Sequence, residues 1–132
     1  MSEVVLDASA LLALLKGEPG GAKVADVLAS ARIGVFNYAE VISHFIRLGM
    51  PENEVDAMLD PLPLTVVPAD KALARIAGSL RAVTAEAGLS LGDRFCLALA
   101  RRDALPAWTA DAVWKTIAAA SGAEVVVIRD HR

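Results

Sequence analysis

The amino-acid sequence predicts a three-layer α/β/α sandwich with a central, mainly parallel five-stranded sheet. Short runs rich in β-branched residues alternate along the chain with longer stretches whose apolar residues recur at helical spacing. The short runs are apolar throughout rather than at every second residue, which is typical of strands buried on both faces of a parallel sheet. A length of 132 residues and an apolar content of 55% suit a single domain, residues 1–132, with a core of its own.

The first half of the chain is expected to contribute three strands. Val4–Leu6 is a β-branched run that ends at Asp7, and glycines within 17–21 separate the two helical stretches that follow it. Asn37 is expected to open the third helix, because a short polar side chain can cap a helix start. The expected strands of this half are 4–6, 33–36 and 64–67, and the expected helices are 8–16, 22–29, one from Asn37 toward Gly49, and a short one from Pro51 to Asp60.

The second half is expected to add two strands and three helices. Apolar residues recur every three or four positions from Leu73 to Val83, which predicts an amphipathic helix over 70–87. The next helix, 90–103, is apolar nearly all round at its centre and should therefore be buried. The pattern is completed by a strand at 107–109, a helix at 112–120 and a last strand at 125–128.

Cysteine usage and hydropathy exclude several classes of protein. Cys96 is the only cysteine, which excludes a disulfide scaffold and a thiolate zinc site. Apolar runs such as Leu11–Leu15 are much shorter than the roughly 18 residues of a membrane span. The amino terminus shows no secretory signal, so we expect a cytoplasmic protein. A mean hydropathy of +0.48 is high for a small monomer and favours a buried interface with a copy or a partner.

Four acidic residues stand where predicted strands pass into helices. Asp7 ends the first strand, and Glu40 lies four residues past the second. Asp93 sits in the first turn of the buried helix, and Asp111 lies two residues after the strand at 107–109. Because α/β sheets bind ligands beyond the carboxyl ends of their strands, we expect these four side chains to converge at one edge of the sheet.

Each of these acids also has an ordinary structural explanation. Asp7 and Asp111 could be helix N-caps, and Asn37-x-x-Glu40 and Ser90-x-x-Asp93 both fit a capping box. Four carboxylates at one edge repel one another, however, unless a cation lies between them. Hard oxygen ligands without soft ones select Mg²⁺ or Mn²⁺. The cluster therefore indicates a divalent-metal site.

The remaining polar residues do not form a nucleophilic site. No Ser–His or Cys–His pair is evident; His44 fits a helix surface, His131 lies near the chain end, and Cys96 fits a small core residue. The net charge is −3, but without the four acids it is +1, so the body of the protein is nearly neutral. Basic side chains that could reach phosphates around the rim are Lys16, Lys23, Arg47, Arg94, Arg101, Arg102 and Lys115.

Four segments, in order and spacing, resemble a known family. They are Val4–Ser9 (VVLDAS), 37–41 (NYAEV), 89–100 (LSLGDRFCLALA) and 108–111 (WTAD). Together they resemble the PIN-domain nucleases, and among these the VapC-type toxins of toxin–antitoxin pairs, over essentially the whole chain. The resemblance implies a PIN-like fold and a metal-binding, catalytic quartet of Asp7, Glu40, Asp93 and Asp111. It also implies that the hydroxyls of Ser9 and Thr109 support that quartet, although the two could equally be an ordinary helix-start serine and a strand threonine.

The resemblance carries further expectations about activity and partners. It implies a divalent-metal-dependent endoribonuclease, using Mg²⁺ or Mn²⁺, that acts as the toxin of a toxin–antitoxin pair. An antitoxin segment would bind a groove near the first helices and reach the acids with an arginine. A homodimer would form through the middle helices, around 52–83. Two departures from the family pattern are Trp114, where phenylalanine is more usual, and Arg94, which should place a guanidinium beside the metal site.

Two other functions are compatible with the same residues. A haloacid-dehalogenase-like phosphatase also begins with an apolar strand ending in a nucleophilic aspartate, but it needs a second acid two residues later, where Ser9 stands. A catalytically silent PIN-like or receiver-like binding module is the other alternative. The presence of all four acids argues against it, since a silent module has no need of mutually repelling carboxylates.

Overall fold

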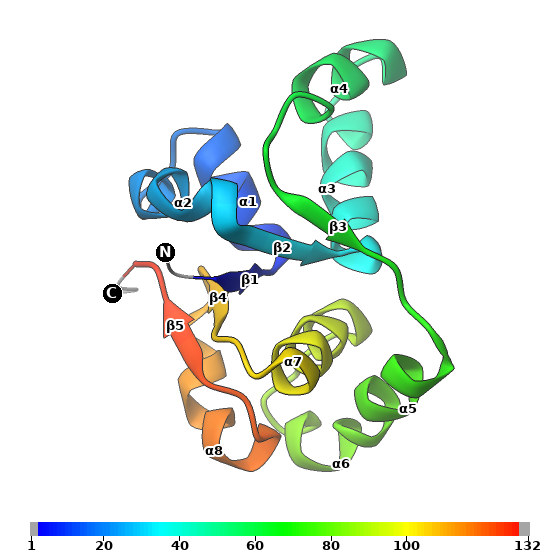
Figure 1. Cartoon of the computed structure of the whole chain (residues 1–132), viewed down its shortest axis with the longest axis vertical. Helices are drawn as coiled ribbons and strands as arrows, with labels where there is room; N and C mark the ends of the chain where they lie inside the picture. The colour runs from blue at the N-terminus through cyan, green and yellow to red at the C-terminus, as the bar shows by residue number, and fades with distance from the viewer. Residues whose placement is uncertain (1–2, 130–132) are drawn as a thin grey trace.

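The computed structural model describes residues 3–129, which form a five-stranded sheet between two layers of helices (Figure 1). The strand order is β3-β2-β1-β4-β5, and all four neighbouring pairs are parallel. The predicted fold class is therefore confirmed, while His131 lies outside the described residues. The strands are β1 (Val4–Leu6), β2 (Ala31–Gly34), β3 (Thr65–Val67), β4 (Ala107–Thr109) and β5 (Val125–Val127).

The central strand β1 sets where the carboxyl ends of its neighbours lie. Leu6, its last residue, pairs with Ile33 of β2 and Trp108 of β4. The strands β1, β2 and β4 are buried or nearly so, as expected for a parallel sheet covered on both faces. The chain segments that leave β1, β2 and β4 therefore emerge side by side at one edge of the sheet, as the sequence predicts.

One face of the sheet is covered by the helices of the first half of the chain (Figure 1). Leu11 on the first helix is fully buried, whereas Leu12, Leu14 and Leu15 are only partly buried against the same core. Four leucines within five positions thus cannot all reach the interior, as the sequence suggests. The helices of this layer are α1 (Ala8–Leu15), α2 (Gly21–Val27), α3 (Val35–Arg47) and α4 (Glu52–Leu59), with a short 3₁₀ turn, η1, at Leu28–Ser30.

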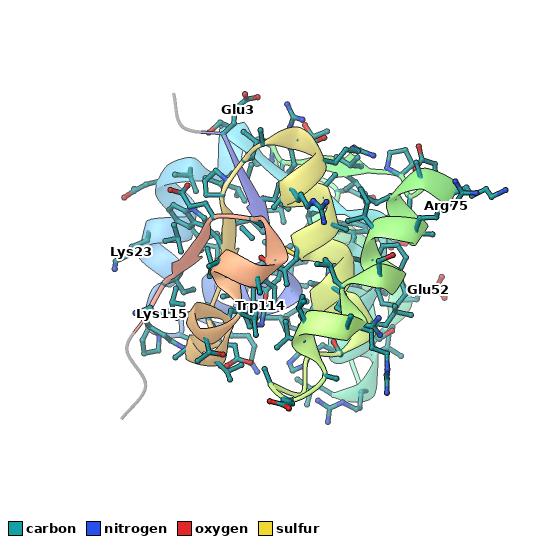
Figure 2. The ribbon with its side chains drawn as sticks, turned by 90° about the horizontal axis from the view of Figure 1, so that it is seen from below. Glu3, Lys23, Glu52, Arg75, Trp114 and Lys115 are labelled. Atoms are coloured by element: carbon teal, nitrogen blue, oxygen red, sulfur yellow. The ribbon has the colours of Figure 1, made fainter. Side chains whose placement is uncertain are left out.

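The opposite face carries a second core built on α7. Leu97 and Leu99 of α7 are fully buried there with Trp114, which lies in the interior while Lys23, Arg75 and Lys115 point outward (Figure 2). The elements of this layer are α5 (Lys71–Ser79), α6 (Arg81–Thr84), α7 (Leu91–Asp103), the 3₁₀ turn η2 (Ala112–Thr116) and α8 (Ala118–Ser121). Among residues 3–129, the structure contains no helix with the length and apolarity to cross a membrane.

The boundary between β2 and α3 differs from the prediction. The expected strand 33–36 is displaced: β2 ends at Gly34, and α3 begins at Val35 rather than at Asn37. Gly34 takes the N-cap position with extended backbone and no capping side chain. The apolar run Ile33–Phe36 looks like a strand in the sequence, but its last two residues form the first turn of the helix and are exposed.

Two predicted helices are each divided in the structure. The helix expected at 70–87 breaks at Leu80, whose ψ of −16° departs from α-helical geometry and separates α5 from α6. The helix expected at 112–120 is a 3₁₀ turn followed by α8, separated at Ile117. The spacing of apolar residues does not reveal such breaks, because the buried face of the helix continues on both sides of them.

Gly21 is expected to be required where α2 crosses α1. A Cβ at this position would lie about 2.5 Å from the Ala13 carbonyl oxygen, and a backbone atom cannot move aside cheaply. Gly21→Ala should therefore lower the free energy of unfolding by about 1–3 kcal/mol in urea titrations. The exposed α5 residue Gly78, which has nothing within 4 Å of its Cβ position, is the matched control. Gly78→Ala should be neutral or stabilising by up to about 1 kcal/mol, and equal effects of both changes would contradict this packing argument.

Candidate functional site

Asp7 is the most deeply buried acid of the predicted set. It follows β1 directly and is 3% exposed. Its Oδ1 accepts hydrogen bonds from the Ala10 backbone N–H at 2.8 Å and the Ser9 hydroxyl at 2.7 Å, and its Oδ2 accepts one from Thr109 Oγ1 at 2.7 Å. Asp7 is thus the N-cap of α1, as its ordinary structural explanation predicts, and it also links β1 to β4.

Ser9 and Thr109 hold the Asp7 carboxylate and the loop after β4 together. Besides donating to Asp7, the Ser9 hydroxyl accepts a hydrogen bond from the Ala110 N–H at 2.9 Å. Thr109 Oγ1 likewise accepts one from the Asp111 N–H at 3.1 Å. The two hydroxyls therefore fix the orientation of the carboxylate and the path of the chain toward Asp111. Such contacts are those a supporting residue of a metal ligand makes.

Asp93 lies in the first turn of α7 and forms the predicted capping box. Its Oδ2 accepts a hydrogen bond from the Ser90 backbone N–H at 2.9 Å, and its own N–H donates to Ser90 Oγ at 3.1 Å. Asp111 similarly caps η2, because its Oδ1 accepts from the Val113 N–H at 3.1 Å. Three of the four acids therefore do cap helices.

Glu40 is oriented by Asn37, but not through the predicted capping box. Asn37 is a buried residue of the first turn of α3, and its Nδ2 donates both to Glu40 Oε1 and to the Gly92 carbonyl, each at 2.9 Å. The capping-box prediction for this pair is wrong, since Asn37 caps no helix. Asn37 instead ties α3 to the start of α7, a role that its spacing from Glu40 hints at but does not specify.

Gly92 is a second residue whose importance the sequence does not reveal. The Glu40 carboxylate lies over it, and a Cβ at Gly92 would come about 2.5 Å from both Glu40 carboxylate oxygens. The absence of a side chain at this position therefore leaves room for Glu40 beside Asp93. The glycine directly before Asp93 is the only sequence signal of this arrangement.

We call Asp7, Glu40, Asp93 and Asp111 the acidic cluster, and burial raises the pKa values of the first three. Desolvation raises the pKa of Asp7 from 3.8 to about 6, and it also raises the pKa values of Glu40 and Asp93. The charge of Asp93 adds to the increases at Asp7 and Glu40, and the charge of Asp111 adds to that at Asp93. The sheet edge thus brings the four predicted acids into electrostatic contact, with Asp93 as the shared neighbour.

The acidic cluster is not a preformed metal cage. Among residues 3–129, no three Asp, Glu, His or Cys side chains are arranged to hold one ion together. Each of three acids nevertheless keeps one oxygen that accepts no hydrogen bond from the described part of the chain, namely Glu40 Oε2, Asp93 Oδ1 and Asp111 Oδ2. An all-oxygen set with desolvated, mutually repelling charges fits a hard divalent cation.

Arg94 and Cys96 of α7 lie close to Asp93 in sequence, but both are buried in the protein interior. The expectation that Arg94 stands beside the metal site is wrong: its guanidinium is buried and turned toward α5, where Nη1 donates to the Ala77 carbonyl at 3.2 Å. A position next to Asp93 on a helix points about 100° away from it, which explains the difference. Cys96 is fully buried, and burial raises the pKa of its thiol well above the usual value, consistent with the predicted core role.

Comparisons with known proteins agree with this geometry. The model of the PIN-domain family matches residues 4–120. A toxin–antitoxin complex from Klebsiella pneumoniae has a chain of similar fold, with a TM-score of 0.73, 20% identity, and coverage of 98% of this chain and 100% of that chain. DNA-bound VapBC from Salmonella typhimurium gives a TM-score of 0.74 at 16% identity, covering 98% and 100%.

A third similar structure is a VapC toxin from Mycobacterium tuberculosis, described as cleaving the sarcin–ricin loop. Its TM-score is 0.68 at 16% identity, with 86% of this chain and 94% of that chain covered. No curated protein sequence matches the chain. The solved structures thus share the fold along nearly the whole chain, and the family match includes every residue of the acidic cluster.

The raised pKa of Asp7 predicts a pH-dependent stability in the presence of chelator. The folded state binds the Asp7 proton up to about pH 6, and the unfolded state only up to about pH 3.8, so ionisation opposes folding as the pH rises between these values. Wild-type protein should lose about 2 kcal/mol of stability through this residue between pH 4 and 7. Asp7→Asn, which cannot ionise, should lack that loss.

The measurement is urea unfolding of both proteins across this pH range. The difference in free energy of unfolding between wild type and Asp7→Asn removes the contributions of the other titrating groups. A difference that stays constant from pH 4 to 7 would show that the Asp7 carboxyl is not desolvated as the structure indicates.

Proposed function

Because the chain belongs to the PIN-domain family, we propose that it is a divalent-metal-dependent endoribonuclease acting as the toxin of a toxin–antitoxin pair. The observation that carries this proposal is the acidic cluster at the carboxyl edge of the sheet, with three carboxylate oxygens that accept no hydrogen bond within residues 3–129. Residues 1–132 would form one nuclease domain, since one sheet with a core on each face accounts for the described chain.

We assign the metal ligands to Asp7, Glu40, Asp93 and Asp111. A bound Mg²⁺ or Mn²⁺ would neutralise these charges, polarise a phosphoryl oxygen and acidify a water molecule. Ser9 and Thr109 would hold Asp7 in one orientation, and Asn37 would hold Glu40. Because these contacts exist within the chain itself, the acids need little reorganisation when substrate arrives.

No side chain of the described site is suited to act as a covalent nucleophile. The Ser9 and Thr109 hydroxyls donate to Asp7, and Cys96 is buried with a raised thiol pKa. We therefore assign the attack on phosphorus to water, with the acidic cluster binding and orienting the reacting groups. This division of roles is typical of hydrolysis that leaves no enzyme-bound intermediate.

The choice of substrate and partners is supported by the structures of similar fold. One such toxin is described as cleaving the sarcin–ricin loop, and another similar chain comes from a toxin–antitoxin complex. We propose RNA as the substrate and an antitoxin protein that binds near α1 and α2, where Leu12 and Leu14 are only partly buried. We also propose a cytoplasmic location, and a homodimer formed through the segment around 52–83.

A silent PIN-like binding module remains the alternative, and one observation favours it. Asp7, Asp93 and Asp111 each take part in capping a helix, so these carboxylates have a structural role that requires no metal. The phosphatase alternative is not retained, because the chain belongs to the PIN-domain family and Ser9 occupies the position where a second acid is required.

The nuclease proposal predicts RNA cleavage that depends on Mg²⁺ or Mn²⁺ and stops when chelator is added. Asp7→Asn and Asp93→Asn should each lower the cleavage rate at least about 100-fold, because each removes a charge that binds the metal. Asp26→Asn is the matched control, since Asp26 is an exposed carboxylate of α2. Calorimetry should detect uptake of metal by the wild type and much weaker uptake by Asp7→Asn.

Circular dichroism of the same variants establishes whether they fold. Chelator-resistant cleavage, or a folded wild type that takes up no metal at millimolar concentration, would contradict the proposal. Metal-independent binding of a partner protein, without hydrolysis, would instead support the silent module.

The position of Gly92 predicts a more selective defect. Gly92→Ala should fold normally, because the group that its methyl displaces is the flexible end of Glu40 rather than backbone. The displaced carboxylate should weaken metal affinity at least tenfold, as measured by calorimetry. Gly78→Ala, on exposed α5 surface, should leave metal affinity unchanged. Equal metal affinity in the two variants would show that Glu40 is not a ligand.

A further inference from the structure

An open hollow lies next to the acidic cluster on the exposed face of α3. Its volume is about 520 Å³, within the range of roughly 300–1,000 Å³ for small-ligand sites. Figure 1 shows that α3 begins at the carboxyl end of β2 and runs away from the sheet toward α4. Because Glu40 belongs to both features, whatever occupies the hollow lies beside the candidate metal site. The lining residues recur at helical spacing and are Phe36, Ala39, Glu40, Ser43, His44 and Arg47.

One end of the hollow carries an exposed aromatic ring. Phe36 is 36% exposed and stacks on Phe95 of α7, with ring centroids 4.9 Å apart and an interplanar angle of 15°. Phe95 packs against the core of the second face, so it supports Phe36 from beneath. A ring that is exposed but already held in a stack can accept a further planar group without being ordered first.

The other end is lined by His44 and Arg47, and Lys16 lies beside His44 just outside it. Lys16 Nζ lies 3.1 Å from His44 Nε2, and Arg47 Nη2 lies 3.5 Å from His44 Nδ1. A neutral imidazole has one acceptor nitrogen, so it cannot accept from both cations at once. Glu18 pairs with Lys16 at 3.8 Å, but within residues 3–129 no carboxylate lies within ion-pair distance of Arg47. This basic end is therefore suited to an anion.

We infer that this hollow is a subsite for the RNA substrate, with one base stacked on Phe36 and a backbone phosphate bound by Arg47. The inference rests on the proposed function, which supplies the RNA and the adjacent cleavage site. A π-face, a cationic end and the proposed metal ligand Glu40 within one hollow match an RNA base, a backbone phosphate and the bond to be cleaved.

The composition of the hollow disfavours a protein segment as its occupant. A helix docking in a groove presents a continuous apolar stripe and needs an apolar floor. Only Phe36 and Ala39 of the six lining residues are apolar, while the other four are polar or charged. Beside its apolar surface the hollow therefore offers hydrogen bonds and charge, which a nucleic acid uses and a purely apolar helix face does not.

The experiment measures RNA binding rather than cleavage, so that it does not depend on catalysis. A fluorescent 12-nucleotide single-stranded RNA is titrated into full-length Asp7→Asn protein, with and without further changes. Phe36→Ala should weaken RNA affinity about tenfold, whereas Phe36→Trp should restore it to within about twofold. Arg47→Ala should weaken affinity about fivefold and reduce the salt dependence by roughly one phosphate contact. Arg75→Ala is the control, since Arg75 is an exposed cation that points outward from α5 (Figure 2).

A 2-aminopurine base in the RNA gives a direct measure of stacking. Its fluorescence should be quenched on binding to the Asp7→Asn protein and to the Phe36→Trp variant, but not to Phe36→Ala. Sedimentation of each variant establishes whether the oligomeric state changes. Unchanged affinity and quenching in Phe36→Ala and Arg47→Ala would overturn the subsite, even if the wild type cleaves RNA in the presence of metal.

A change in oligomeric state would also overturn it, since the face would then be an interface between copies. If the wild type cleaves no RNA but the Phe36 and Arg47 variants lose affinity and quenching, the subsite stands and the nuclease proposal fails.

Discussion

The buried carboxylate of Asp7 is the constraint on which the rest of the structure depends. It ends β1, caps α1 through the Ala10 N–H, and accepts hydrogen bonds from Ser9 and Thr109. One side chain thereby fixes where the first helix starts and how β4 leaves the sheet. The same burial raises its pKa to about 6, so the folded protein holds this negative charge at a cost in free energy.

In the other acids of the acidic cluster, one carboxylate oxygen accepts a hydrogen bond within the fold and the second is available to a ligand. Asp93 and Asp111 each accept a backbone N–H with one oxygen, and Glu40 accepts the Asn37 side-chain amide with one oxygen. Within residues 3–129, the other oxygen of each accepts no hydrogen bond. Helix capping would therefore not compete with the proposed metal binding at these positions, because it uses one oxygen and orients the other. This explains why capping and metal binding are difficult to separate from sequence, since both require a short acid at a helix start.

The start of α3 decides how this edge of the sheet is presented to solvent. Because the helix begins at Val35, Phe36 turns outward onto Phe95, and Asn37 turns inward to reach Glu40 and Gly92. A start at Asn37, as the sequence indicates, would have placed Phe36 in a strand. The difference arises because Gly34 ends β2 without any polar side chain to mark the boundary.

The sequence by itself determined the parallel sheet, the order of its elements and the four acids of its carboxyl edge, because apolar runs and chain direction carry that information locally. Only the tertiary structure decided that Asn37 orients Glu40, that Gly92 makes room for it, and that Arg94 turns to Ala77. These roles depend on contacts between α3, α5 and α7, elements distant in sequence. No local pattern records such contacts, since the side chains meet only when the helices pack.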